Sequence, residues 1–411
     1  MKKKISALLL ALGLCFTNAM PVFAETKDPV IQGKSAIAVD LDTNEIVYTK
    51  NIDQKAYPAS ITKMLTALVM AENKQKTDEL KYTETASKQP PYSYRLNVHP
   101  VKVGDTITAD GAMDALLLFS GNDIAYMIAD NVAGNEQNFA KLMNDKAKKL
   151  NMTNSHFITP NGLDENTTEH YTTAYDLTKL ASAAYKNPWV KEVMAKKEST
   201  LQFSNGPVGK VQNRNKLVGT DGCVGGKTGV TSKAGRCLAA IFERDGRRMV
   251  GVVMNSKYNY PQDTIVFEDM KNLMNWAYSA KKEKLVSKGS TITTLKVPYK
   301  VLPFIGPKRT LDVPVEVKED VTYYNNDIKP EKQFKLNNLN AWKLNSKSSA
   351  GKLIVSQRDS KKEYDLYSKV SKFDIIKQNI LIYIGLLVLI ILLVTGIVFL
   401  VNKFRSRRDF Y

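Results

Sequence analysis

The residues from Ile380 to Val401 form an apolar stretch without a single charge, and this stretch constrains the architecture of the chain more than any other feature. At a rise of 1.5 Å per residue, a helix of this length spans about 33 Å, compared with ~30 Å for the hydrocarbon core of a bilayer. Lys403 and three arginines follow directly, and a basic flank stays on the cytoplasmic side. We therefore predict one transmembrane helix over 380–401 and a cytoplasmic basic tail over 402–411. A buried core helix is the alternative.

The first 24 residues have the pattern of a signal peptide. Lys2, Lys3 and Lys4 precede a short apolar run, and Val22-Phe23-Ala24 provides a cleavage site before Glu25. The run is too short to span a bilayer. We predict removal of 1–24, with Cys15 in it, and a mature protein that crosses the cell membrane once. The part between the two ends then lies on the extracellular, cell-wall side.

Composition limits the partners of this outer part. The chain has 411 residues, 43% of them hydrophobic, which predicts two or three folded units and excludes wholesale disorder. Its net charge of +18 would suit nucleic acid in a cytoplasmic protein, but the predicted membrane topology argues against a nucleic-acid partner. Anionic wall polymers or lipid headgroups are suitable partners, and a lysine-rich solvated surface is the alternative. Three cysteines are too few for a disulfide framework.

The sequence changes character near Leu285. Before it, an N-terminal hairpin, two apolar helices and several β-rich segments predict an α+β domain over 25–284. The predicted elements are a hairpin over 35–48, helices over 61–71, 113–132 and 266–278, and strands over 223–227, 235–241 and 249–254. After it, alternating Val, Ile, Thr and Tyr predict a small β-sandwich-like domain over 285–369. The charged, partly amphipathic segment from Lys361 to Lys377 is expected to connect this domain to the membrane span, and the connector between the two is assigned to 370–379.

Ser60-Ile61-Thr62-Lys63 places a hydroxyl and an amine one turn apart on one helix face, close enough for a hydrogen bond. Ser60 could then be a nucleophile and Lys63 its base. An ordinary lysine is neutral at pH 7 only at a cost of about 4.6 kcal/mol, which burial among apolar neighbours reduces. The pattern alone is weak, because it occurs twice more in polar contexts. A helix cap beside a lysine that extends to solvent is the alternative.

Two further motifs follow. Ser120-Gly121-Asn122 interrupts an apolar run, where a buried hydroxyl and amide need partners, so it indicates either a site or a helix start. Lys227-Thr228-Gly229 is expected to end a strand, so that its lysine and hydroxyl project from an edge to which a peptide could be added as a further strand. An ordinary turn is the alternative. Gly229 would let a substrate approach the backbone. The three motifs in this order are a far stronger signal than any one of them.

With these motifs the chain resembles the D-alanyl-D-alanine carboxypeptidases, the low-molecular-mass penicillin-binding proteins with an active-site serine. The resemblance covers PASITKMLT, FSGNDIAYMIAD, HFITPNGL, HYTTAYDL and GGKTGVTSKAG. It implies the serine β-lactamase/DD-peptidase-like α+β fold, in which an antiparallel sheet is flanked by helices and joined to an all-helical part.

The resemblance also implies roles at the matching positions. Ser60 is the acylated nucleophile and Lys63 its general base, while Ser120 relays a proton to the leaving group and Asn122 binds a substrate amide. Lys227 and Thr228 bind the terminal carboxylate. The backbone N–H groups of Ser60 and Val230 form the oxyanion hole.

The implied reaction removes the terminal D-alanine from a peptidoglycan stem pentapeptide ending in D-Ala-D-Ala, and β-lactams would trap Ser60. No cofactor or metal is implied, and His99, His156 and His170 form no ligand cluster in the sequence. The alternatives are a β-lactamase, with Glu165 or Glu169 assisting deacylation, a DD-transpeptidase, and a non-catalytic wall-binding or receptor protein.

The sequence departs from its apparent family in two places. Where relatives often have an arginine for the substrate carboxylate, the segment after the third motif offers only Lys257. The C-terminal helix is predicted to cross the membrane, whereas relatives often have an amphipathic helix lying on it. Separately, Cys223 and Cys237 flank the third motif almost symmetrically, so a hairpin centred near Val230 would allow a disulfide between them.

Overall fold

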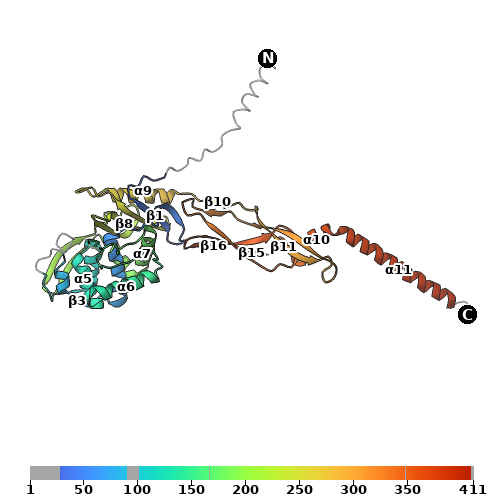
Figure 1. Ribbon diagram of the computed structural model, residues 1–411, viewed down its shortest axis with the longest axis horizontal. Helices are drawn as coiled ribbons and strands as arrows, with labels where there is room; N and C mark the ends of the chain where they lie inside the picture. Colours follow the sequence, from blue (N-terminus) through green and yellow to red (C-terminus); the bar gives the residue numbers. More distant parts are fainter. Residues whose placement is uncertain (1–27, 90–100, 166, 348, 409–411) are drawn as a thin grey trace, which may run out of the picture.

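The computed structural model describes residues 28–89, 101–165, 167–347 and 349–408. The predicted signal peptide over 1–24, with Cys15, lies outside the described residues, and so does His99. Along the long axis of the molecule, the α+β region comes first, the β-rich region follows, and the C-terminal helix leaves from the far end (Figure 1).

A five-stranded antiparallel sheet forms the centre of the α+β region. The predicted N-terminal hairpin is present as β1 (Ser35–Asp40) and β2 (Ile46–Lys50). The other strands are β7 (Cys223–Thr231), β8 (Gly235–Arg244) and β9 (Arg247–Ser256). The strand order is β2-β1-β9-β8-β7, so the strand that carries Lys227-Thr228-Gly229 lies at the edge of this sheet, as expected. The motif does not end the strand, because β7 continues to Thr231.

Both faces of this sheet are buried, because successive residues of each strand alternate between two cores. Ile37 and Ile241 point into a core shared with the helical part. Ala38 and Phe242 point to the opposite face, which is covered by helix α9 (Ile265–Ser279) (Figure 1). Strands buried on both faces are apolar at nearly every position, as β1 and β8 are. The predicted α+β fold class is confirmed by this arrangement.

The helical part packs against the face of the sheet opposite α9. Its helices are α2 (Lys63–Asn73), α3 (Glu84–Ser87), α4 (Ala109–Asp114), α5 (Asn122–Ala133), α6 (Glu136–Lys149), α7 (Ala174–Lys186) and α8 (Pro188–Ala195). Two ribbons complete it: β3 (Glu79–Lys81) with β4 (Thr106–Thr108), and β5 (Glu198–Phe203) with β6 (Gly206–Gln212). The predicted helix over 113–132 is split, because a π-helical turn, η2 (Ala115–Phe119), ends at Ser120 before α5 begins.

The β-rich region has its own core and a second five-stranded sheet. Its order is β11 (Thr291–Lys300), β12 (Lys308–Val317), β16 (Ser360–Ser368), β15 (Ser349–Gln357) and β14 (Glu331–Leu336). A two-stranded ribbon, β10 (Glu283–Val286) with β13 (Val321–Tyr323), and a 3₁₀ turn, η3 (Ala341–Lys343), complete it.

One sequence-based expectation is wrong in this region. The charged segment from Lys361 to Lys377 does not act as a connector over its whole length, because Ser360–Ser368 is strand β16 in the middle of the sheet. Lys361, Glu363 and Asp365 are exposed on one face of the strand, while Leu366 and Ser368 on the other face are buried. The charges of the solvent face therefore obscured the alternation of a half-buried strand.

The expected disulfide is also absent, since Cys223 and Cys237 are both free thiols. In the β7–β8 hairpin, Thr231 pairs with Gly235, so the turn lies beyond Val230. This register places Cys223 opposite Phe242 and Cys237 opposite Gly229. The two cysteines are thus too far apart along the ladder to be cross-strand partners.

Charged contacts connect the two regions. The buried Glu45, in the turn between β1 and β2, accepts hydrogen bonds from Lys282 at 2.7 Å and from Lys362 at 2.8 Å. Arg358, in the β15–β16 turn, donates to Asp53 at 2.5 Å. The β15–β16 hairpin therefore lies against the α+β region on the side of the β1–β2 hairpin.

The chain ends in a short helix, α10 (Lys372–Gln378), and a long one, α11 (Ile380–Arg408). Of the described helices, α11 alone is long and apolar enough to cross a membrane, over Ile380–Arg405. Its leucines, isoleucines and valines are exposed, so it is not a core helix in this structure. The helix continues beyond the predicted end of the span at Val401 into the basic tail.

Candidate active site

The first motif lies at the junction of two helical segments. Ser60 is in a 3₁₀ turn, η1 (Ala59–Thr62), that leads directly into α2, whose first residue is Lys63. The Nζ atom of Lys63 is 2.9 Å from the Oγ atom of Ser60. Ala59 has φ = 47°, a left-handed conformation that costs about 1–2 kcal/mol for a residue with a Cβ atom. The backbone is therefore held in a strained conformation immediately before Ser60.

Lys63 is completely buried, and burial lowers the pKa of its amine to about 7, although Asp123 opposes this shift. Besides its contact with Ser60, Nζ donates to the Oδ1 atom of Asn122 at 2.8 Å and to the backbone carbonyl oxygen of Asn161 at 2.8 Å. Both of these oxygens can only accept hydrogen bonds. A neutral amine that keeps both bonds has its lone pair left for the third direction, toward Ser60.

Ser120 and Asn122 of the second motif come from the break between η2 and α5. Ser120 has φ = 74°, and this left-handed conformation ends the π-helical turn. Its side chain is buried, and its Oγ atom has no hydrogen-bond partner among the described residues. Asn122 starts α5 and contacts Lys63. The structure therefore brings the first and second motifs together at the amine of Lys63.

The third motif lies directly beside the first. Gly229 is packed so tightly against η1 that a Cβ atom there would lie 2.9 Å from the carbonyl oxygen of Pro58 and 3.0 Å from the backbone nitrogen of Ser60. Only glycine permits this approach. Lys227 is buried, and its Nζ donates to the carbonyl oxygen of Thr228 at 3.1 Å. Burial lowers the pKa of Lys227 well below its usual value, and the charges of Lys63, Arg236 and Arg214 lower it further.

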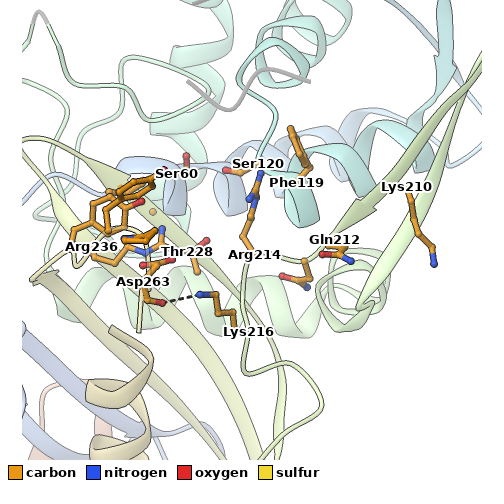
Figure 2. Close-up of a pocket in the computed structure, with 16 residues that line it drawn as sticks. Ser60, Phe119, Ser120, Lys210, Gln212, Arg214, Lys216, Thr228, Arg236 and Asp263 are labelled. Carbon is orange, nitrogen blue, oxygen red and sulfur yellow. Dashed lines mark hydrogen bonds and ion pairs between the residues drawn. The ribbon is translucent and has the colours of Figure 1, made fainter. Parts of the chain in front are cut away.

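The three motifs border one cleft of about 550 Å³. Ser60, Ser120 and Thr228 line it together with Arg214 and Arg236 (Figure 2). Gly229 and Val230 also line it, whereas Lys63, Asn122 and Lys227 lie beneath its surface. All eight residues selected from the sequence thus belong to one contiguous site. Asp263, which binds Arg236 at 2.5 Å, is the sole carboxylate among the described residues that line the cleft.

Sequence reasoning missed the cations of the cleft. It considered Lys257, downstream of the third motif, but Lys257 is exposed and does not line the cleft. Arg236, which is 5% exposed, does line it, because its position on β8 pairs with Val230 on β7. Its Nε atom has no hydrogen-bond partner among the described residues. The sequence signal that could have identified Arg236 was the predicted hairpin, because its two strands place a residue near position 236 beside Val230.

His170 supports the first motif from behind. It is fully buried, and its Nδ1 atom accepts hydrogen bonds from the backbone N–H groups of Ile158 at 3.2 Å and Thr159 at 3.3 Å. The proton of the neutral ring is therefore on Nε2, which donates to Thr62 at 3.0 Å. Burial lowers the pKa of His170 to about 3. Within the described part of the chain, no group of three or more His, Cys, Asp or Glu residues could hold a metal ion.

This site and fold can be compared with known proteins. Residues 22–258 match the model of a protein family described as D-alanyl-D-alanine carboxypeptidase, Peptidase_S11. The match covers more than half of the chain and includes all three motifs.

The chain belongs to this family. It is 28% identical to the D-alanyl-D-alanine carboxypeptidase DacF of Bacillus subtilis, over 82% of this chain and 86% of that protein. It is 31% identical to a D-alanyl-D-alanine endopeptidase of Escherichia coli, over 68% of this chain and 90% of the relative.

Solved structures agree with this membership. A D-alanyl-D-alanine carboxypeptidase from Mycobacterium tuberculosis superposes with a TM-score of 0.57 at 27% identity, covering 63% of this chain and 96% of that one. The Streptomyces K15 DD-transpeptidase superposes with a TM-score of 0.56 at 27% identity, covering 61% and 99%. The resemblance stated from the sequence is thereby confirmed, and the protein is a serine-type D-Ala-D-Ala carboxypeptidase of the penicillin-binding class.

Proposed function

We propose that the enzyme removes the terminal D-alanine from peptidoglycan stem pentapeptides through an acyl-enzyme on Ser60. The observation that carries this proposal is the hydrogen-bond pattern around Lys63. A buried amine with a pKa near 7, held by two acceptors, presents its third bonding direction to the hydroxyl of Ser60 at 2.9 Å. A general base is most effective when its pKa lies near the working pH.

Acylation follows from this geometry. The neutral Lys63 takes the proton of Ser60 as Oγ attacks the carbonyl carbon of the penultimate D-alanine. The backbone N–H groups of Ser60 and Val230 would stabilise the negative oxygen of the tetrahedral intermediate. As the C–N bond breaks, the proton passes from Lys63 through Ser120 to the leaving amine, and D-alanine departs. Water then hydrolyses the ester, so Ser60 regains a proton and the shortened peptide leaves.

The terminal carboxylate of the substrate needs cationic or hydrogen-bonding partners in the cleft. Lys227 and Thr228 are the family's expected partners, and Arg236 supplies a third group in this chain. Its guanidinium is already oriented by Asp263, and it adjoins the strand residue Val230. We assign the binding of this carboxylate to Arg236, in place of Lys257, which was the only candidate found in the sequence. Charge-assisted hydrogen bonds of this kind are worth about 1.5–3 kcal/mol each.

Rapid β-lactam hydrolysis is the less favoured alternative. A β-lactamase needs a base to activate water against the acyl-enzyme, but Glu165 and Glu169 are exposed and do not line the cleft. Asp263, which does line it, is paired with Arg236. We therefore propose that β-lactams acylate Ser60 and stay bound. A transpeptidase would use the same acyl-enzyme and differ only in the amine that replaces water.

The test is incubation of the purified enzyme with a pentapeptide ending in D-Ala-D-Ala, with D-alanine and peptide products measured. Ser60→Ala should abolish D-alanine release, and unchanged release would disprove the assignment. Adding an amine acceptor separates hydrolysis from transpeptidation. Mass mapping after penicillin treatment should place the adduct on Ser60, and an adduct elsewhere or multiple turnover of the drug would contradict the proposal.

We further propose the organisation expected from the sequence: a signal peptide over 1–24, a peptidase domain over 25–284, a β-rich domain over 285–369, a connector over 370–379, a span over 380–401 and a cytoplasmic tail over 402–411. The peptidase domain would face the cell wall. The basic residues at the C-terminal end of α11, Lys403 and the three arginines, support this orientation, because such a flank stays cytoplasmic.

A further inference from the structure

The β11–β12 hairpin projects beyond the rest of its sheet. β12 pairs with β16 only over Val315–Val317, whereas its pairing with β11 continues to Lys300 and Lys308. At ~3.4 Å per residue, the hairpin therefore extends about 24 Å past the last β16 pair. It extends toward the end of the β-rich region from which α11 leaves (Figure 1).

The far end of this hairpin is attached to the start of α11. The hydroxyl of Tyr383, one turn into the helix, donates to the carbonyl oxygen of Val301 at 2.6 Å. Asn379, which is buried, donates to the hydroxyl of Tyr299 at 2.9 Å and accepts from Arg309 at 2.8 Å. Tyr299 belongs to the core of the β-rich region. The loop between the strands is thus held at the level where the apolar stretch of α11 begins.

This loop, residues 301–307, has a composition unusual for an exposed turn. It contains no charge, and its two largest exposed side chains, Phe304 and Ile305, are 84% and 67% exposed. The carbonyl oxygen of Ile305 accepts from the N–H of Leu302 at 3.1 Å, which closes the turn, and Val301 at its base is buried. Lys300, Lys308 and Arg309 flank the loop, and no acidic residue lies between positions 300 and 309.

We propose that the loop over 301–307 inserts into the outer surface of the membrane that α11 crosses, with Phe304 and Ile305 among the lipid chains and the flanking cations at the headgroups. An apolar tip with a basic surround is the pattern of interfacial membrane binding. The position of the loop indicates that lipid is what it binds, because a loop bonded to the first turns of a spanning helix already lies at the bilayer surface. Together with α11, this second contact fixes the orientation of the β-rich region on the membrane. The proposal is independent of the chemistry at Ser60.

The test uses the full mature chain in nanodiscs of phosphatidylcholine and phosphatidylglycerol. Phe304→Cys is labelled with an environment-sensitive nitrobenzoxadiazole dye, and Phe334→Cys, on β14 in the same region, is the matched control. Phe334 is 43% exposed, and the native Cys223 and Cys237 are buried and protected from labelling. Ile305→Cys is a second probe position in the loop, in case one label disturbs it.

We expect blue-shifted emission at positions 304 and 305 and strong quenching by spin-labelled lipids, with water-like emission and little quenching at position 334. Equal spectra and equal quenching at the loop and control positions would overturn the proposal. Because the nanodiscs contain no protein besides the scaffold belt around their rim, a loop that binds a protein partner instead would give this second result.

Discussion

The backbone carbonyl oxygen of Asn161 lies 2.8 Å from the side-chain amine of Lys63, although the two residues are 98 positions apart in the sequence. Since this oxygen can only accept a hydrogen bond, one N–H group of the Lys63 amine must point toward it. The loop that contains Asn161 therefore helps to direct the lone pair of Lys63 toward Ser60.

The loop is positioned by Gly162, and its replacement should impair both stability and acylation. Gly162 has φ = 88°, and a Cβ atom there would lie 1.9 Å from the carbonyl oxygen of Ala59. We expect Gly162→Ala to lower the free energy of unfolding by about 3 kcal/mol and to slow acylation by penicillin. The control is Gly134→Ala, which has φ = 82° but open space around the added atom. It should cost only about 1 kcal/mol and leave acylation unchanged. Equal losses in the two variants, measured by urea unfolding, would contradict this explanation.

The rate of acylation should depend on pH through Lys63. Only the neutral amine can accept the proton of Ser60, and its pKa is about 7. The second-order rate constant for acylation by a β-lactam should therefore fall about tenfold for each pH unit below 7 and level off above it. Lys63→Ala should remove this dependence and lower the plateau by about 10²–10⁴-fold. Stopped-flow measurement with a chromogenic β-lactam checks both, and an unaltered slope in Lys63→Ala would exclude this base.

His170 should make the fold sensitive to acid. Its pKa is about 3 in the folded protein, compared with 6.5 for an unperturbed histidine, so below pH 6.5 the unfolded chain binds a proton that the folded chain does not. The stabilisation is thus present above pH 6.5 and is lost progressively as pH falls toward 3. At pH 5 the loss from this residue is about 2 kcal/mol. His170→Gln should be less stable at pH 7.5 and should show a shallower loss between pH 7 and 5. Parallel stability curves for the two proteins would rule out this role.

Arg236 should matter more than Lys257 for substrates with a free C-terminal carboxylate. We expect Arg236→Gln to lower kcat/KM for a pentapeptide by about 10–100-fold, because one charge-assisted bond to the carboxylate is lost. Lys257→Gln is the matched control and should have little effect. A pentapeptide with an amidated C-terminus separates binding from folding, since Arg236→Gln should barely change its poor turnover. An equal loss on both peptides would instead indicate a structural defect.

Local patterns predicted the parts of the site that depend on short-range order. Ser60 and Lys63 are three residues apart in one helical turn, and this spacing fixes their contact. The N-terminal hairpin and α9 also follow from patterns within about 15 residues. The roles of Asn161 and Arg236 were not predictable in this way. Asn161 acts through its backbone carbonyl group, which every residue has, so no side-chain pattern marks it. Arg236 lies beside Val230 only because of the register of the β7–β8 hairpin.

Two expectations were wrong for different physical reasons. The disulfide was expected because Cys223 and Cys237 flank Val230 in the sequence, but the turn lies further along and places Cys237 opposite Gly229. The position of that turn depends on which residues of the partner strand lie opposite, and a single strand carries little information about its partner's register. Strand β16 was taken as a connector because the charges of its exposed face, Lys361, Glu363 and Asp365, obscured the alternation of a half-buried strand.

The ion pairs of Glu45 with Lys282 and Lys362 have a mechanical consequence. The carboxylate of Glu45 binds Lys282, which precedes the β-rich region, and Lys362, which belongs to it. A tilt of the β-rich region would therefore also move the α+β region that carries the cleft. With α11 in the membrane, as we propose, the length of strands such as β15 and β16 would set the height of the cleft above the lipid. Longer strands would then place the cleft at a different depth of the cell wall, without altering a single atom around Ser60.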